Sequence, residues 1–525
     1  MAPSSRGAAA ATRSAEDAPD LVFSHANIVT LDPSLPRARS LRVRGERILT
    51  VSREPVAAGD RDALVIDCSG RTIVPGFIDA HTHLVGHARA LTQLELGPGH
   101  VRSIADLQRT LRSALQGLPA GSWVTGRGYD EFALGRHPNR VDLDEVAPLH
   151  PLSLTHRSGH AHVLNSAALA LAGITTETGD PPDALIDRDP QTGEPTGLLF
   201  GMQRQLAQVV PARDTDALEQ GIVLAGRALL SLGVTSLHDT SERNGLQRLE
   251  QLRGWRRRGL LASRVDIALG WETFESLDAA AIAALAHDCA VRVTGVKLSV
   301  HEVTGRTSPP ASELARRVAA IHAQGWQALM HAIEPGTIEA ACVAVEAALA
   351  RSPRRDHRHR IEHASICPPA LARRIAAAGI VVVTQPGFIA AHGQRYRATV
   401  PAGEQPHLYP LATLLGAGVR VAAGADAPAG PADPLLGIRA AVWRRGCDGV
   451  AVAPAQAISP RQALRLCTTG AAHALRDEGR RGHLRPGMLA DLAILSGDPT
   501  RDAAGAADVR VVQTVIGGRM HAPHG

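Results

Sequence analysis

The stretch that decides the fold is IVPGFIDAHTH, residues 73–83. An apolar run ends here in two histidines, His81 and His83, which are separated by one residue. Residues i and i+2 of an extended strand point to the same side, so both imidazoles can reach one ion. The stretch therefore predicts a buried strand that presents two metal ligands at its end.

Seven further strand-like runs follow, and the segments between them carry apolar residues at helical spacing. The runs are GVTSLHDT (233–240), SRVDIALG (263–270), VRVTGVKLSV (291–300), WQALMHAI (326–333), HRIEHASI (359–366), GIVVVTQPG (379–387) and GVRVAAGADA (418–427). Eight strands that alternate with helices predict an α/β fold, namely a (β/α)₈ TIM barrel. We place this barrel at residues 73–480.

Short alternating apolar runs, broken by Gly, Pro and Asp, occupy residues 20–72 and recur at 481–525. They predict one composite β-sandwich domain built from both termini. Residues 88–215 are too many for one loop of a barrel, so they predict an inserted lid lobe that carries substrate contacts. The Ala/Ser-rich residues 1–19 are interpreted as a disordered tail.

Composition excludes several classes of protein. The chain has 525 residues, 44% hydrophobic and 20% charged, which is typical of a globular protein. A formal charge of +5 without a basic stripe gives no reason to expect nucleic acid as a partner. No run of 18 apolar residues appears, so no membrane span is expected. The 6 cysteines form no CxxC pair, which favours a reducing cytoplasm over a disulfide framework.

The chain contains a single lysine, Lys297, among 56 Lys and Arg residues. Arg stays protonated, whereas a buried lysine amine can lose its proton and be modified. Such an amine could react with CO₂ and form a carbamate, whose two oxygens can bridge two ions. The alternative is a solvent-facing lysine or an ion pair with Glu302.

Polar residues close the other predicted strands as well, and these residues are His238, Asp239, Lys297, His331, His363 and Asp426. The active site of a TIM barrel lies at the carboxyl ends of its strands. Imidazole and carboxylate ligands suit Zn²⁺, and Fe or Mn less selectively. One HxH pair alone is a weak signal, but its combination with three further strand ends favours a metal site.

Further motifs are GRGYD (126–130), RSGHAHVLNSAAL (157–169), GEPTGLL (193–199), RIEHASI (360–366), GADAP (424–428) and LRPGMLADLAIL (484–495). Together with VPGFIDAHTH and GVTSLHD, in this order, they resemble the amidohydrolase superfamily, in particular the branch of N-substituted formamide deformylases. The resemblance covers nearly the whole length. It implies a barrel with a composite β-sandwich and a centre of one or two divalent ions, first of all zinc. The implied ligands are His81, His83, carboxylated Lys297, His331, His363 and Asp426.

Two loops depart from the pattern of this branch. The segment after Lys297 reads SVHEVTGRTS (299–308) where an Asp-Gly-Ser loop is usual, and Glu334-Pro335 replaces the usual Gly-Asp. The metal ligands are unaffected by these departures. The leaving group is not implied, because both loops border the site.

The expected reaction is hydrolysis of a non-peptide C–N bond, of the amide or formamide type, in a small-molecule substrate. A metal ion lowers the pKa of bound water towards about 7 and polarises the carbonyl. Asp426 would act as general base and then as general acid, unless it only orients a ligand. His238 would polarise the carbonyl or support a ligand, and a hydrogen-bonded histidine at the barrel rim is an equal alternative.

Substrate contacts are predicted for Arg127, His160 and Asn165 in the lid, and for Glu302 in the barrel. For Arg127, an ion pair with Asp130 or Glu131 is the competing interpretation. Two rival functions stay open. A deaminase of a ring amine shares most of the ligands but usually has no carboxylated lysine, and an inactive binding protein should have lost ligands. The oligomeric state is open, with a homodimer as one option.

Overall fold

The computed structural model describes residues 20–55, 63–181, 184–210, 215–285, 290–303, 306–501 and 508–521. The tail predicted at residues 1–19 lies outside them. The chain divides into two compact units, one within Met1–Thr82, Gly226–Asp426 and Gly430–Gly525, the other within His83–Ala225 and Ala427–Ala429. The insertion predicted at 88–215 falls within the second unit.

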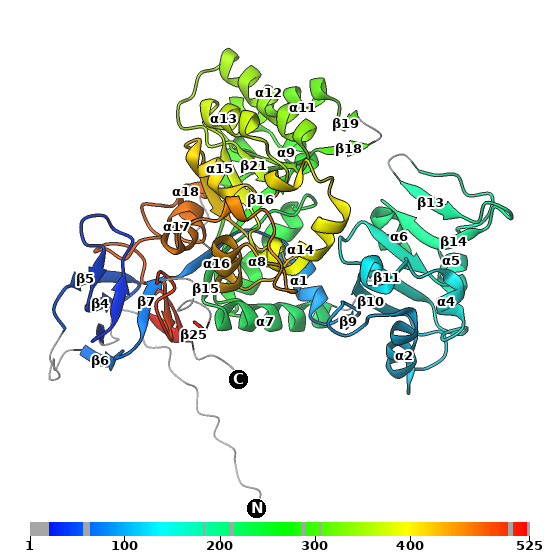
Figure 1. The fold of residues 1–525 in the computed structure, drawn as a ribbon, viewed down its shortest axis with the longest axis horizontal. Coiled ribbons are helices and arrows are strands. Elements are labelled where there is room, and N and C mark those ends of the chain that lie inside the picture. The colour runs from blue at the N-terminus through cyan, green and yellow to red at the C-terminus, as the bar shows by residue number, and fades with distance from the viewer. Residues whose placement is uncertain are drawn as a thin grey trace, which may run out of the picture. The chain divides into compact units, whose positions relative to one another are not determined.

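Eight parallel strands form the centre of the first unit (Figure 1), and each strand pairs with the next one along the chain. They are β8 (Phe77–Thr82), β15 (Val234–Asp239), β16 (Arg264–Gly270), β17 (Val291–Ser299), β20 (Ala328–Ala332), β21 (Arg360–His363), β22 (Val381–Thr384) and β23 (Arg420–Ala423). This arrangement confirms the predicted α/β barrel. Strands buried on both faces read as continuous apolar runs, which is why the sequence revealed them.

Helices alternate with the barrel strands. They are α8 (Leu246–Arg257), α9 (Trp271–Ser276), α10 (Ala279–Leu285), α11 (Ala311–Ala323), α12 (Pro335–Arg351), α13 (Pro369–Ala377), α14 (Gly387–Thr399), α15 (Leu411–Gly416), α16 (Pro434–Trp443), α17 (Pro460–Leu466) and α18 (Thr469–Ala474). Helix α7 (Thr215–Ser231) leads from the second unit into β15. In the described part of the chain, no helix has both the length and the apolar character needed to cross a membrane.

The barrel closes between β23 and β8. The Asp426 amide donates to the His81 carbonyl at 2.7 Å, and the Ala425 amide donates to the Asp79 carboxylate at 2.9 Å. Gly424 makes this approach possible, because a Cβ at that position would lie 2.6 Å from the His81 amide nitrogen. The closure therefore brings two predicted metal ligands, His81 and Asp426, next to each other.

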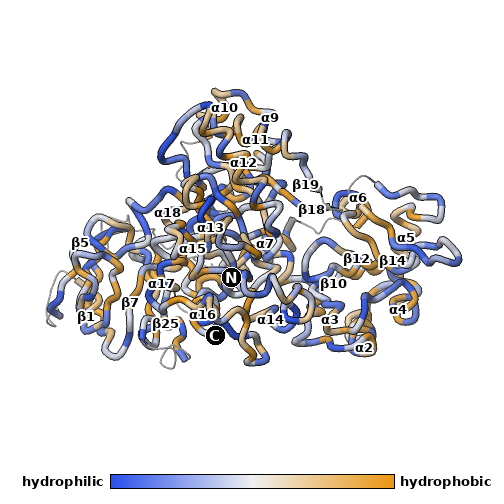
Figure 2. The backbone as a smooth tube through the Cα atoms, turned by 45° about the horizontal axis from the view of Figure 1, so that its top comes forward, coloured by the Kyte–Doolittle hydropathy of each residue, from blue (hydrophilic) through white to orange (hydrophobic). Residues whose placement is uncertain are grey.

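The two ends of the chain share one β-sandwich in the first unit. One sheet contains β1 (Asp20–Ser24), β4 (Ser40–Arg44), β5 (Arg47–Ser52) and β6 (Ala63–Asp67). The other contains β2 (Asn27–Val29), β3 (Arg37–Ala38), β7 (Thr72–Pro75), β24 (Leu492–Leu495), β25 (Val511–Ile516) and β26 (Arg519–His521). Strand β24 pairs with β7, so residues from both termini build one apolar core. Figure 2 shows the apolar character of β1 and β7.

The second unit has its own sheet and its own apolar core. The sheet order is β13 (Leu185–Arg188), β14 (Pro195–Phe200), β12 (Ala161–Leu164), β11 (Leu152–His156), β10 (Val124–Tyr129) and β9 (Leu94–Glu95). Its helices are α1 (Leu84–Ala90), α2 (Ile104–Leu115), α3 (Glu131–Leu134), α4 (Arg140–Asp144), α5 (Ser166–Leu171) and α6 (Gln203–Val209). A sheet covered by helices explains why so long an insertion forms a compact unit.

A chain of buried histidines lies at the end of the barrel where the strands begin. The His359 ring accepts a hydrogen bond from the Ala328 amide at 3.0 Å, and its other nitrogen contacts His322 at 2.9 Å. His322 in turn bonds the Ser352 carbonyl at 2.7 Å. A proton added to His359 would face the Ala328 N–H, so the chain requires a neutral ring. Burial, followed by the charge of His357, lowers the pKa of His359 well below its usual range.

The hydrogen-bonded histidines predict that the protein loses stability in acid. The unfolded chain takes up a proton on His359 below about pH 6.5, and the folded protein does not. The free energy of unfolding therefore decreases as the pH is lowered. We expect His359→Gln to make this decline shallower by about 1 kcal/mol between about pH 6.5 and 5.5, because the unfolded histidine is half protonated at the upper pH and almost fully protonated at the lower one. Urea denaturation at several pH values measures the slope.

The matched control is His100→Gln, because His100 is exposed in the folded protein. This variant should keep the slope of the unmodified chain. An unchanged slope in His359→Gln would show that His359 is protonated as readily in the folded protein as in the unfolded chain.

Candidate metal centre

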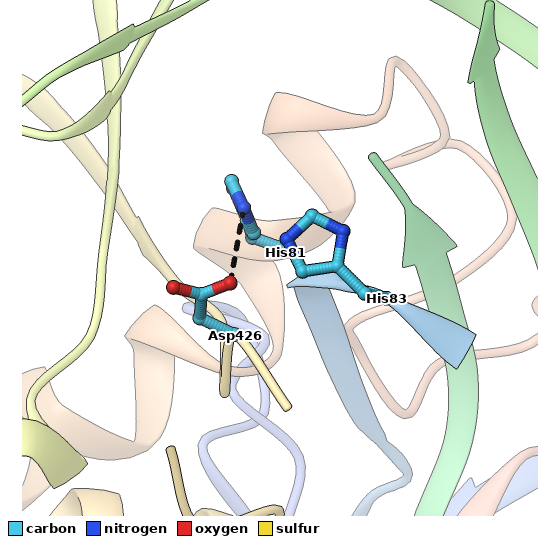
Figure 3. Close-up of side chains that lie close together, drawn as sticks. All are labelled: His81, His83 and Asp426. Carbon is cyan, nitrogen blue, oxygen red and sulfur yellow. Dashed lines mark ion pairs between the residues drawn. The ribbon is translucent and has the colours of Figure 1, made fainter. Parts of the chain in front are cut away.

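The carboxyl ends of the barrel strands bring the predicted ligands together. His81 lies in β8, Lys297 in β17, His331 in β20 and His363 at the end of β21. Asp426 follows β23, and His83 is the N-cap residue of α1 directly after β8. The ligand atoms of His81, His83 and Asp426 all lie within 4.8 Å of one another (Figure 3).

His81 is completely buried and contacts carboxylates through both ring nitrogens. Its Nδ1 makes a short hydrogen bond to Glu362, and its Nε2 lies 3.6 Å from Oδ1 of Asp426. A carboxylate accepts hydrogen bonds and cannot donate one when ionised. Nδ1 therefore carries the proton, and Nε2 has a lone pair directed at the site.

Four imidazoles form a continuous row at this end of the barrel. The ring centroids of His81 and His363 are 4.9 Å apart, those of His363 and His331 are 4.5 Å apart, and those of His331 and His301 are 4.7 Å apart. His301 was missed in the sequence, although it follows Lys297 by four residues in one of the two unusual loops. It lies in β18 (His301–Val303), which pairs with β19 (Arg306–Ser308).

The backbone adopts an unusual conformation at two of the predicted ligands. The φ angle is 75° at His363 and 54° at Asp426, in the left-handed region that residues other than glycine rarely occupy. The side chain of His363 is oriented by Gln385, whose Oε1 lies 2.8 Å from Nδ1. Strained conformations of this kind are concentrated at functional sites, which agrees with a role for both residues.

Lys297 is 3% exposed. Burial lowers the pKa of its amine, while the carboxylates of Glu362 and Asp426 oppose that shift. A lowered pKa increases the neutral fraction of the amine, which is the form that can react with CO₂. Burial likewise lowers the pKa values of His331 and His363, and neutral imidazole is the form that binds a metal ion.

These residues fit a divalent metal ion. Imidazole nitrogens and a carboxylate converge from different strands, and the His81 tautomer leaves Nε2 on the side of Asp426. Nitrogen and oxygen donors of this kind suit zinc and other first-row divalent ions.

His238 does not offer a ring nitrogen to a substrate in this arrangement. It is completely buried, Arg360 donates to its Nδ1 at 3.0 Å, and its Nε2 lies 2.8 Å from the Thr294 hydroxyl. Both nitrogens are therefore used inside the barrel. A role in support of the site agrees with this geometry, and a direct catalytic role does not.

The residues predicted to contact substrate have different surroundings. Arg127 pairs with Glu95 at 3.6 Å and donates to the Pro428 carbonyl at 3.1 Å, so the ion-pair partner differs from the expected Asp130 or Glu131. His160 is exposed. Glu302 is exposed and lies near Gly336, at the start of α12.

Asn165 is completely buried and uses its side-chain amide within the second unit. Its oxygen accepts from the amides of Leu152 and Ala168, and its nitrogen donates to the carbonyls of Ala147 and His150. Both N–H groups are engaged, so the amide has no donor left for a substrate. This geometry favours a structural role.

We therefore expect Asn165→Ala to destabilise the second unit by about 2–4 kcal/mol, because four hydrogen bonds to buried backbone groups are lost. Urea denaturation combined with amide hydrogen exchange on residues 147–168 measures the effect. His160→Ala, at an exposed position, serves as the control and should leave exchange unchanged. Unchanged stability in Asn165→Ala would contradict the structural role.

The closure of the barrel gives a second prediction. In Gly424→Ala the new Cβ would lie 2.6 Å from both the amide nitrogen and the Cβ of His81, so the backbone must shift. We expect a folded protein whose affinity for Zn²⁺ is at least about tenfold lower, because His81 and Asp426 move apart. Competition with a chromophoric chelator measures the affinity.

Gly437→Ala is the matched control, because nothing lies within 4 Å of its added Cβ in α16. It should bind Zn²⁺ like the unmodified chain and gain up to about 1 kcal/mol of helix stability. Equal affinities of the Gly424 and Gly437 variants would show that the closure does not set the ligand geometry.

The chain is similar to known proteins over most of its length. The chain is 30% identical to N-substituted formamide deformylase of Arthrobacter pascens, over 95% of this chain and 97% of the relative. It is 28% identical to a putative amidohydrolase, YtcJ, of Bacillus subtilis strain 168, over 88% of this chain and 91% of the relative.

Solved structures show the same fold. An uncharacterized metal-dependent hydrolase from Pyrococcus furiosus matches with a TM-score of 0.70 and 25% identity, over 92% of this chain and 100% of that one. The amidohydrolase family model matches residues 64–522, which confirms the resemblance found in the sequence. The chain therefore belongs to the amidohydrolase family, and it is a metal-dependent hydrolase that acts on C–N bonds.

Proposed function

We propose that the protein hydrolyses the C–N bond of a small N-substituted formamide or a related amide. The observation that carries this proposal is the convergence of His81, His83 and Asp426, with His363 4.0 Å from Asp426 and the buried Lys297 under the electrostatic influence of Asp426. The similarity to a formamide deformylase over almost the full length supports the substrate class. We propose zinc as the metal, as one or two ions held by His81, His83, Lys297, His331, His363 and Asp426.

We further propose that Lys297 is carboxylated. Its neutral amine nitrogen would attack the carbon of CO₂, a C–N bond would form, and one proton would leave. The carbamate would supply two anionic oxygens to the metal site. Burial of the amine supports this step, because it increases the neutral fraction.

A bound divalent ion supplies Lewis acidity, since it lowers the pKa of water and polarises a carbonyl oxygen. The proton of the attacking water would pass to the Asp426 carboxylate, which is 8% exposed and lies 4.0 Å from the His363 ring. Asp426 would then return that proton to the leaving nitrogen as the C–N bond breaks. Formate and an amine would be the products from a formamide.

The test compares the unmodified chain with Lys297→Arg, whose side chain is also long and basic but stays protonated and cannot form a carbamate. We expect two Zn²⁺ per chain in the unmodified protein and at most one in the variant, measured by plasma mass spectrometry after incubation with bicarbonate. Release of formate and of the amine from N-benzylformamide should fall at least about 100-fold in the variant.

Other outcomes would assign the chain differently. One result would contradict this proposal and indicate a deaminase instead. It is one ion in both proteins, with ammonia released from ring amines and no formate released from formamides. No bound metal in either protein after incubation with Zn²⁺ and bicarbonate would contradict both enzymatic functions.

A further inference from the structure

A buried ion pair lies beside the metal site, in the strand that also provides His363. Arg360 and Glu362 are both completely buried. They are two residues apart in β21, so the strand directs both side chains to the same side. The sequence motif RIEHASI contains both residues, but neither was identified as part of the site.

The guanidinium of Arg360 holds the Glu362 carboxylate with two hydrogen bonds. Nε donates to Oε1 at 2.7 Å, and Nη2 donates to Oε2 at 2.8 Å. Nη2 also donates to the Ala80 carbonyl at 2.9 Å, which ties the pair to β8 next to His81. The charge of Glu362 is therefore balanced, although the carboxylate is not exposed to water.

Glu362, held in place by Arg360, in turn orients His81. Its carboxylate accepts the Nδ1–H of His81 and so fixes both the tautomer and the orientation of the ring. With the proton on Nδ1, the lone pair of Nε2 is directed at Asp426, 3.6 Å away. The opposite tautomer would place a proton on Nε2, so this nitrogen could not bind a metal ion on the side of Asp426.

His238 holds Arg360 on its other side. Arginine has no hydrogen-bond acceptor, so the 3.0 Å contact between Nη1 and His238 Nδ1 requires a lone pair on Nδ1. The Nε2–H of His238 then donates to the Thr294 hydroxyl at 2.8 Å. Residues from four barrel strands, β8, β15, β17 and β21, are thereby connected in one hydrogen-bond network.

Stability alone is a weak explanation for this network. Replacement of a buried ion pair by apolar residues of similar volume is often neutral or stabilising, because the charges lose their hydration. The pair is placed against a predicted ligand, and partners that orient metal-bound histidines typically affect metal affinity. A positioning role explains both the burial and the location.

We propose that Glu362, Arg360 and His238 are positioning residues that hold His81 as the Nδ1–H tautomer, with Nε2 available to the metal ion. This inference rests on the proposed function, since it concerns the same metal centre. It assigns His238 a role through Arg360, without contact to the substrate.

The experiment measures binding of Zn²⁺ and Co²⁺ to three purified full-length variants. In Glu362→Gln an amide NH₂ must face either Arg360 or His81, so the His81 tautomer is no longer fixed. We expect the affinity for Zn²⁺ to fall by about 10- to 100-fold and the visible absorption of the Co²⁺ protein to change. Thr294→Val removes the last bond of the network and should have a smaller effect in the same direction.

The matched control is Asp266→Asn. Asp266 is 1% exposed and lies beside His238 in the register of β15 and β16, but its carboxylate pairs with Arg481 at 2.8 Å and with Arg292 at 3.5 Å, outside the network that reaches His81. It should lose stability and keep the Zn²⁺ affinity and the Co²⁺ spectrum of the unmodified chain. Urea denaturation of all variants separates general destabilisation from an effect on the metal centre.

Two results would overturn the inference. In the first, Glu362→Gln binds Zn²⁺ and Co²⁺ like the unmodified chain. In the second, Asp266→Asn loses affinity as much as Glu362→Gln does. Failure of the proposed function looks different, because the unmodified chain itself would then bind no metal ion.

Discussion

The hydrogen bond from the Asp426 amide to the His81 carbonyl is the interaction on which the site depends. A barrel must close, and here the closure joins the first strand to the segment after the last one. The same contact places the side chains of His81 and Asp426 3.6 Å apart. Because Gly424 has no side chain, the two segments can approach closely enough. The fold and the geometry of the candidate metal site are thus set by one structural requirement.

Residues that stabilise the barrel and residues of the candidate active site lie at opposite ends of the barrel axis. The His322–His359 chain lies where the strands begin, whereas the candidate ligands lie where the strands end. In barrels of this kind, residues that serve the chemistry generally lie at the carboxyl ends of the strands, and residues that serve stability lie at the opposite end. The Arg360–Glu362 pair belongs to both groups, because it is buried in the core and contacts His81, a candidate ligand.

The eight strands could be predicted because buried parallel strands are apolar throughout and alternate with helices. The candidate ligands were found because a polar residue at the end of such a strand is conspicuous. The roles of Glu362 and Arg360 were not predicted, since the periodicity of a strand does not show which of its charged residues contact each other. The positive φ at His363 could not be foreseen either, because it depends on contacts such as that with Gln385. Likewise, the partner of Arg127 is Glu95, which is distant in sequence.

The two unusual loops of this chain lie together in space. A Cβ added to Gly336, directly after Glu334-Pro335, would lie 3.2 Å from Glu302, and the neighbouring His301 contacts the ring of His331. The sequence departures are therefore concentrated on one side of the barrel end, around β20. None of them replaces a candidate ligand. Substitutions in this region can change the substrate preference while the closure, the candidate ligands and the Arg360–Glu362 pair stay the same, because none of these is built from the two loops.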